Sequence, residues 1–405
     1  MPKKGKKGAK PADEEDDLAF LEAMAAANQA KIAQEEEKNK IPEEVFQDLP
    51  QSPLDAHPNR DFPPRCIMEY TGHKSSRARS EEQDQHLQEL VDALPDLREG
   101  GRIHELVRNW ALNKPIIHPG VKLYDMCWEI EEAVRREVKF NPPTRCMAFP
   151  CGCSLNNVAA HYSPLPGDET VLGQSDLMKI DFGVAINGYI IDSAFTVCFD
   201  DKFKNIIEAT REATETGIRM LGPDAPLHDI GCAIEEVITS YTQEVNGKDI
   251  PLKPVYNLCG HQMQQYHIHK GKFVPITKLN DNSDRIEAGD LIALETFAST
   301  GTGTVFDHGA ASHFMIAEGA PPAVKAGNLS KLYQFIQNNF KTMAFSQRAL
   351  LAQGYQNYKT SLDQLCHNHV IAPYPPLADE IGSYVSQHEH TIAILEDHKE
   401  VVSRS

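Results

Sequence analysis

The spacing of apolar residues along this 405-residue chain changes between two periods, and each period predicts a different kind of element. Between residues 81 and 138, apolar side chains recur every three to four positions, which is typical of helices with one buried face. Pro95 interrupts this pattern, and we expect a helix to end there, because the residue before a proline is biased away from helical geometry. The predicted helices cover 81–94, 103–112, 123–138, 203–220 and 227–245.

Short runs rich in β-branched and aromatic residues dominate the chain after Cys146 and predict strands. The clearest lie at 178–183, 189–195, 255–258, 272–276, 290–296 and 384–395. A polar, largely helical segment at about 317–372 interrupts them. Helices and hairpins in this order predict an α+β fold, in which helices cover one face of a mostly antiparallel sheet and a helical insertion forms a subdomain.

Two aspartates lie on either side of an Asn187-Gly188 pair, which is the strongest short-range signal for a β-hairpin with a two-residue turn. That turn would pair Gly183 with Asp192 and place Asp181 on the same face as Asp192. The two carboxylates would then be diagonal cross-strand neighbours. Because like charges on an apolar hairpin repel each other, we expect a cation between them.

Three further polar residues enter or follow apolar runs. Glu295 interrupts the run at 290–297, and a buried glutamate requires a cation, a hydrogen-bond network or a proton. Glu389 enters another apolar run beside two histidines, and His261 follows Gly260. Each residue also has an explanation without a metal. Glu295 could form a salt bridge in the core, Glu389 could be partly hydrated, and His261 could have only a packing role.

Taken together, these five residues offer hard carboxylate oxygens and one imidazole, a set that suits Mn²⁺, Co²⁺, Fe²⁺ or Zn²⁺. Four carboxylates carry enough negative charge to neutralise two divalent ions. Two ions about 3.5–4 Å apart form a hydrolytic site, because they lower the pKa of a water molecule and polarise a carbonyl group.

Motifs from about residue 46 to the C-terminus resemble, in order and spacing, those of the type 2 methionine aminopeptidases, which have the pita-bread fold. The motifs are Ala148-Phe149-Pro150, Cys153-Ser154-Leu155-Asn156-Asn157, Ala160-His161-Tyr162, Lys179-Ile180-Asp181-Phe182-Gly183, Ile191-Asp192-Ser193-Ala194-Phe195-Thr196, Gly260-His261, Ile268-His269, Glu295-Thr296-Phe297, Ser312-His313-Phe314-Met315, Pro373-Tyr374-Pro375-Pro376 and Glu389-His390-Thr391-Ile392. The resemblance implies an enzyme that removes the initiator methionine from nascent proteins when the second residue is small and uncharged.

The resemblance also implies a role for each ligand. Asp181 would bind one ion, whereas Asp192 and Glu389 would bridge both. His261 and Glu295 would bind the other ion, and Glu295 would also accept a proton from the attacking water.

Six positions match the substrate side of the family's site. His161 would contact the scissile amide nitrogen and help the leaving amine depart, and in the family the matching histidine is the target of fumagillin-type epoxides. His269 would steady the substrate carbonyl. Without the resemblance, a core histidine beside Tyr162 is the simpler interpretation of His161. The remaining positions match the lining of the methionine pocket: Phe149, Ile268, His313 and Tyr374.

Two related classes and one different function are weighed against this interpretation. Type 1 enzymes and X-Pro peptidases fit less well, because the former have a shorter connection between the strands of Glu295 and Glu389 and the latter show Glu-Pro-Gly-type sequence at Glu295. A non-catalytic pita-bread protein that binds ribosomes or translation factors is disfavoured, because all five ligands are present. Gln264, His267 and Cys259 depart from the family pattern without touching a ligand.

Composition limits the remaining possibilities. The formal charge of −18 argues against specific nucleic-acid binding, and no apolar run is long enough to span a membrane. Nine cysteines, an odd number without paired metal-binding spacing, indicate free thiols and a reducing compartment, so we expect a cytoplasmic protein. We also expect the protein to be a monomer.

The N-terminal region differs in composition from the body. Residues 1–10 carry five lysines and 13–17 are all acidic, so we expect a disordered tail with one helix over 1–44, a proline-rich lead-in over 45–79 and the catalytic domain over 80–405. The tail is either a solubilising extension or a docking segment, and the resemblance implies association with ribosomes and an initiation factor.

Overall fold

The computed structural model describes residues 41–70, 78–279, 283–325 and 327–405. The helices in these residues are η1 (Glu43–Phe46), α2 (Pro53–Ala56), α3 (Glu81–Asn113), α4 (Leu123–Glu137), η2 (Asp201–Phe203), α5 (Lys204–Met220), α6 (Leu227–Thr239), α7 (Gly327–Asn339), α8 (Gln347–Ala352) and α9 (Lys359–His367). The strands are β1 (Ile67–Glu69), β2 (Arg145–Leu155), β3 (Val158–Ala160), β4 (Met178–Ile186), β5 (Tyr189–Val197), β6 (Thr242–Val245), β7 (Lys248–Pro251), β8 (Lys253–Pro254), β9 (Cys259–Met263), β10 (Phe273–Pro275), β11 (Leu291–Ser299), β12 (Phe306–Asp307), β13 (His313–Ile316), β14 (Ile371–Tyr374), β15 (Leu377–Ala378), β16 (Val385–Ile394) and β17 (His398–Val401).

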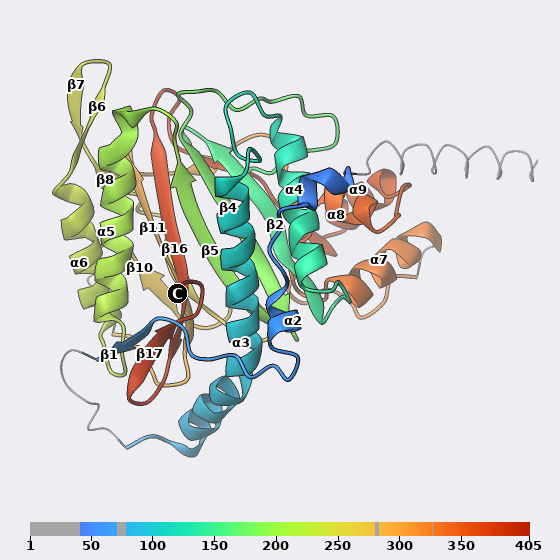
Figure 1. Cartoon of the computed structure of the whole chain (residues 1–405), viewed down its shortest axis with the longest axis horizontal. Helices are drawn as coiled ribbons and strands as arrows, with labels where there is room; N and C mark the ends of the chain where they lie inside the picture. The colour runs from blue at the N-terminus through green and yellow to red at the C-terminus, as the bar shows by residue number, and fades with distance from the viewer. Residues whose placement is uncertain (1–40, 71–77, 280–282, 326) are drawn as a thin grey trace, which may run out of the picture.

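Two sheets form the centre of the molecule (Figure 1). The smaller has the order β2-β4-β5, and the larger runs β1-β17-β16-β11-β9-β10, with β8 also paired to β11. Every pairing between named strands in the described residues is antiparallel. The expected α+β architecture with a mostly antiparallel sheet is therefore confirmed.

Helices α3 to α6 cover the face of the sheets that is turned to the viewer in Figure 1. Each pair of helices packs on one sheet through its own apolar core, as the helical periodicity requires. The core beneath α3 and α4 includes Leu97, Ile103, Met126, Ile130, Phe182 and Ile190. The core beneath α5 and α6 includes Ile206, Ile234, Ile292, Leu294 and Ile392.

The Asn187-Gly188 hairpin forms as predicted. Gly183 pairs with Asp192 and Ile186 with Tyr189, so the register is confirmed. Asn187 and Gly188 have φ values of 51° and 83°, the left-handed geometry that this kind of turn requires.

Pro95 does not end a helix, so the prediction of two helices at 81–94 and 103–112 is wrong. Helix α3 is continuous through the proline, and Ser80 forms a capping box with Gln83 at its start. The proline removes the helical hydrogen bond to the carbonyl of Val91, and this residue lies on an exposed side of the helix. Further along the same helix, Gly101 lets the backbone of Val402 approach so closely that an added Cβ would lie 1.8 Å from the Val402 carbonyl oxygen.

Two other predictions need correction. The helix expected at 227–245 ends at Thr239, and the β6–β7 hairpin follows, because a two-residue turn at Asn246-Gly247 reverses the chain. Residues 255–258 form a turn before β9, not a strand. The helix expected at 123–138 is confirmed, and its buried stripe faces the smaller sheet.

Two segments border the central domain. Helices α7 to α9 pack around a separate apolar core with β13 and β14, and this helical insertion is orange in Figure 1. On the N-terminal side, Phe46 is buried against Trp110, with ring centroids 5.8 Å apart, and β1 pairs with β17. The tail expected over 1–44 lies outside the described residues up to position 40, and the domain boundaries stay predictions.

Candidate metal and substrate site

The two sheets meet where β5 runs beside β16, and side-chain hydroxyls join the strands there. The Thr391 hydroxyl accepts a hydrogen bond from the Asp192 amide (2.8 Å) and donates one to the Asp192 carbonyl (2.6 Å). The Ser193 hydroxyl donates to the Glu389 carbonyl (2.8 Å). These bonds hold Asp192 of one sheet next to Glu389 of the other.

A cavity of about 90 Å³ lies at this junction. All candidate site residues from the sequence analysis line it: Phe149, His161, Asp181, Asp192, His261, Ile268, His269, Glu295, His313, Tyr374 and Glu389. The structure thus brings the whole predicted set together, although its members come from strands and loops spread over most of the chain.

Asp192, His261 and Glu389 form the tightest part of this set. One ligand atom from each lies within 4.8 Å of the others, and His261 Nε2 is 3.6 Å from Asp192 Oδ2. Glu295 is the direct cross-strand partner of Glu389. Asp192, His261 and Glu389 are at most 3% exposed, so solvent does little to screen the negative charge.

Gln387 connects the two outer carboxylates and was missed by the sequence analysis. Its Nε2 lies 3.3 Å from Asp181 Oδ2 and 3.2 Å from Glu295 Oε2. A signal was available, because Gln387 precedes Glu389 by two positions and therefore shares its face of the strand.

The carboxyl groups of this cluster all have raised pKa values. Burial raises the pKa of Asp181 to about 7. The pKa of Asp192 is raised mainly by burial and next by the negative charge of Asp181. The pKa values of Glu295 and Glu389 are raised mainly by burial and next by the negative charge of Asp192. Ionised together, these groups require a compensating charge.

Two carboxylate oxygens without hydrogen-bond partners indicate that the compensating charge is a metal ion. Asp181 Oδ1 and Glu389 Oε1 are buried and have no hydrogen-bond partner. Buried polar atoms without partners are rare in native proteins and call for an ion or another ligand. The donor set of carboxylates and one imidazole matches divalent transition metals, so the residues fit a metal centre.

Three further histidines line the cavity, and all three are neutral. Burial lowers the pKa of His161 to about 4 and that of His313 to about 3. The two rings lie 5.7 Å apart, and Tyr374 meets His161 edge-on at 6.3 Å. His269 packs edge-on against His261 at 4.2 Å, and burial lowers its pKa as well. These imidazoles are therefore neutral at neutral pH, and each offers one hydrogen-bond donor and one acceptor.

The rest of the cavity is apolar. Phe149, Ile268, Phe297 and Met315 line it beside the histidines. Gly183 faces Phe149 across the β2–β4 pair, and an added Cβ there would lie 2.3 Å from Phe149 Cε1. The glycine therefore makes room for the ring that shapes this part of the pocket.

Comparison with known proteins agrees with this geometry. A model of metallopeptidase family M24 matches residues 95–319. A methionine aminopeptidase 2 from Komagataella phaffii is 41% identical over 387 residues, which cover 94% of this chain and 85% of the relative. A methionine aminopeptidase 2A from Arabidopsis thaliana is 40% identical over 353 residues, which cover 87% of this chain and 79% of the relative.

Solved structures support the fold. A thermophilic Arx1 superposes with a TM-score of 0.66 at 21% identity, over 78% of this chain and 91% of that one. A methionine aminopeptidase from Thermotoga maritima superposes with a TM-score of 0.51 at 17% identity, over 81% of this chain and 99% of the other. At these identities the likeness shows the fold alone, which is the expected pita-bread fold.

The chain therefore belongs to metallopeptidase family M24. Within this family, the similarity over most of its length places it with the type 2 methionine aminopeptidases, as its motifs predicted. No helix in the part of the chain that the structure describes is both long and apolar enough to cross a membrane.

Proposed function

We propose that this protein uses two divalent metal ions to remove the initiator methionine from nascent polypeptides whose second residue is small and uncharged. The observation that supports this most strongly is the group of four carboxylates and His261 that lines one cavity together with apolar side chains. A purely binding function is disfavoured, because it would leave these mutually repelling groups without a role.

Bound metal ions would lower the pKa of a water molecule and polarise the peptide carbonyl. Asp181 would hold one ion, His261 and Glu295 the other, and Asp192 and Glu389 both. Glu295 would also accept a proton from the attacking water, and Gln387 Nε2 holds the Glu295 carboxylate through the 3.2 Å contact.

The histidines that line the cavity would contact the substrate. His161 is neutral and faces the cavity, so it can relay a proton to the leaving amine, a contribution typically worth about 10²–10⁴-fold in rate. His269 would steady the substrate carbonyl. A thioether side chain fits the aromatic and aliphatic surface of Phe149, Ile268 and Met315.

Partners and location follow from the same function. The substrates are the N-termini of nascent chains, the compartment is the cytoplasm and the enzyme is a monomer. We assign ribosome and initiation-factor contacts to the N-terminal tail, because its five lysines can approach phosphate groups.

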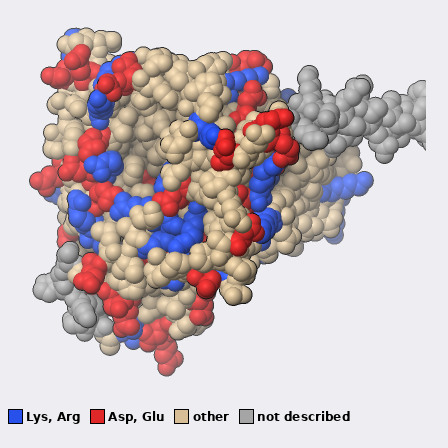
Figure 2. Space-filling view, viewed as in Figure 1, with Lys and Arg blue, Asp and Glu red and all other residues tan. Residues whose placement is uncertain are grey.

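Carboxylates pair with part of the basic surface of the body. Figure 2 shows Lys and Arg side chains grouped near the C-terminus on the face drawn there. Arginines of this region, such as Arg98 and Arg404, are paired with Glu400 and Glu215. Their charge is therefore already compensated.

One preparation can test the proposal. Metal content and hydrolysis of Met-Ala-Ser are measured on the apo-protein and after addition of Mn²⁺ or Co²⁺, with Met-Leu-Ser as the matched control. We expect two ions per chain and release of methionine from Met-Ala-Ser alone. Equal cleavage of both peptides, or activity without metal, would contradict the proposal.

A further inference from the structure

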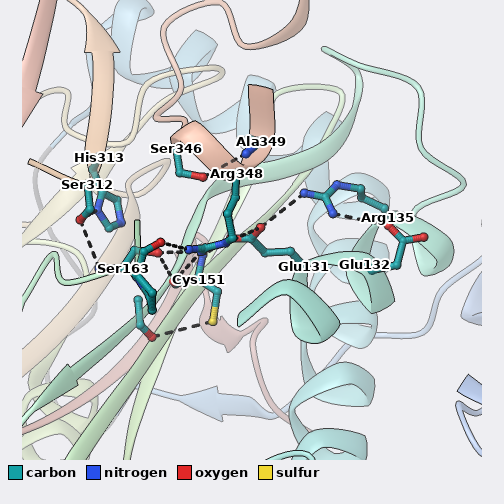
Figure 3. A network of polar contacts seen from close by, with 12 residues as sticks. Glu131, Glu132, Arg135, Cys151, Ser163, Ser312, His313, Ser346, Arg348 and Ala349 are labelled. Atoms are coloured by element: carbon teal, nitrogen blue, oxygen red, sulfur yellow. Dashed lines mark hydrogen bonds and ion pairs between the residues drawn. The ribbon is translucent and has the colours of Figure 1, made fainter. Parts of the chain in front are cut away.

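Arg348 is a charged residue of the helical insertion whose side chain is buried in the catalytic domain. It lies on α8, is 0% exposed and reaches between α4 and the loop that follows His161 (Figure 3). A fully buried arginine is rare unless all of its donors are used, so its contacts show what it holds.

One side of the guanidinium pairs with Glu131 of α4. Arg348 Nη2 lies 2.7 Å from Glu131 Oε1, and Nε lies 3.4 Å from Oε2. Glu131 Oε1 also accepts a hydrogen bond from the Cys151 amide at 3.1 Å. This side anchors the arginine to the rigid core.

The other side of the guanidinium holds the loop. Nη2 donates to the Ser163 hydroxyl (2.7 Å) and Nη1 to the Pro164 carbonyl (2.5 Å). The Ser163 hydroxyl donates in turn to the Cys151 carbonyl (2.6 Å). Arg348 thus fixes two consecutive residues that follow His161 closely in the chain.

Ser312 connects this loop to both histidines of the cavity wall. Its hydroxyl accepts from the Ser163 amide (3.1 Å), donates to the His161 carbonyl (2.6 Å) and lies 3.1 Å from His313 Nδ1. Ser312 is 1% exposed, so no water substitutes for these bonds.

His161 needs such support because its backbone is strained. Its φ is +64°, the left-handed region that a non-glycine residue occupies only when its surroundings hold it there. Ser312 holds His161 directly, through a hydrogen bond to its carbonyl. Arg348 holds Ser163 and Pro164, which follow His161 by two and three positions.

We infer that Arg348, acting through Ser163 and Ser312, is a positioning residue that holds His161 in its productive orientation. This inference rests on the proposed function and deepens it, because it makes the helical insertion part of the substrate-side wall. The metal cluster lies outside this network.

Arg348→Lys tests the inference with little disturbance of charge. The lysine can still compensate Glu131, but it cannot also hold the loop with a planar fork of donors. We expect kcat to fall about 10–10²-fold, since small misplacement of a catalytic group has effects of this size, while metal content stays at the wild-type value. Labelling of His161 by a fumagillin-type epoxide, followed by mass spectrometry, should slow in parallel. Hydrogen exchange in residues 161–164 should accelerate.

Arg135→Gln is the matched control. Arg135 also pairs with Glu131, at 3.4 Å, but within the described residues its side chain forms ion pairs only with Glu131 and Glu132 and none with the loop. We expect wild-type kcat and labelling in this variant. If Arg135→Gln lost as much kcat as Arg348→Lys, compensation of Glu131 would be the cause and the inference would be overturned.

Ser312→Ala keeps the test decisive if Arg348→Lys fails to fold. It leaves the ion pair intact and removes the hydroxyl that contacts the His161 carbonyl, the Ser163 amide and His313 Nδ1. Slower epoxide labelling and lower kcat with unchanged metal content support the inference, whereas wild-type values for both overturn it. A wild-type protein without peptidase activity would instead reject the proposed function, while hydrogen exchange would still report on the loop.

Discussion

The two walls of the cavity are built by different means. On the metal side, Asp181, Asp192, Glu295 and Glu389 lie in the interiors of β4, β5, β11 and β16, where backbone ladders and the Thr391 bonds hold them. On the substrate side, His161 follows β3 in a strained conformation and His313 begins β13. Side chains from elsewhere, above all Ser312 and Arg348, hold this second wall.

This difference implies that metal binding and substrate positioning can be separated. A ladder fixes a strand whatever its side chains are, so the metal wall should tolerate distant substitutions. A wall that is held by a few buried side chains should be sensitive to substitution of those side chains. Changes on the substrate side should therefore lower turnover while the metal stays bound.

Asp192→Asn should have the largest effect. The amide removes a ligand charge that both ions would share, while the backbone bonds of residue 192 to Thr391 persist. We expect turnover to fall to background and metal content to drop, with an unchanged circular dichroism spectrum. Full activity in a variant depleted of metal would break the comparison at its base.

His161→Ala should affect turnover alone. Loss of a proton relay typically lowers kcat by about 10²–10⁴-fold, and we expect two ions to remain bound, because His161 lies on the other wall. Epoxide adducts should disappear from this variant and persist in His367→Ala, which removes an exposed histidine at the end of α9. An adduct on a cysteine in the wild-type protein would count against the assignment.

Gly183→Ala should have an intermediate effect. The new methyl group would overlap the Phe149 ring and push it into the pocket. Overpacking of this kind costs about 1–3 kcal/mol, so we expect KM for Met-Ala-Ser to rise about tenfold. Phe149→Leu in the same chain should recover part of the loss, and a KM that stays at the wild-type value in the single variant would argue that this ring does not contact methionine.

Removal of residues 2–40 should have the smallest effect on hydrolysis. All proposed ligands lie far along the chain, whereas Phe46, just beyond the deletion, packs on Trp110. We expect unchanged kcat, unchanged thermal stability and weaker, more salt-sensitive co-sedimentation with ribosomes. Deletion through residue 49 is the contrasting variant, because it exposes Trp110 and should lower Tm.

A truncated enzyme that still co-sediments normally would place the docking surface on the body. Loss of hydrolysis on removal of residues 2–40 would instead make the tail part of the catalytic fold.

The same difference between the walls explains what could be predicted from sequence. The ligand pair Asp181 and Asp192 follows from strand periodicity and one turn, because these depend on neighbouring residues. His161 could be proposed only through resemblance, since its role depends on contacts with Ser312. Gln387 could have been proposed from its place two positions before Glu389 on the same face of the strand, whereas Arg348 carries no local signal, because its role depends on contacts with distant segments.

The errors in the fold have a related cause. Pro95 is a strong local signal for a helix end, but packing of the flanking segments on the smaller sheet outweighs it. Residues 255–258 have strand-like composition, yet they turn the chain into β9, where His261 must face the cavity. Tertiary packing decided both segments, and a single sequence contains that information only indirectly.

We predict that carboxylates on strands of both sheets form one two-metal site. Anomalous diffraction at the cobalt edge, on crystals of the enzyme prepared with Co²⁺, tests it most directly. We predict two anomalous peaks in the cavity, both in contact with Asp192 and Glu389, one also at Asp181 and the other at His261 and Glu295. Peaks that lie away from these side chains, or a single peak at full Met-Ala-Ser activity, would contradict the account.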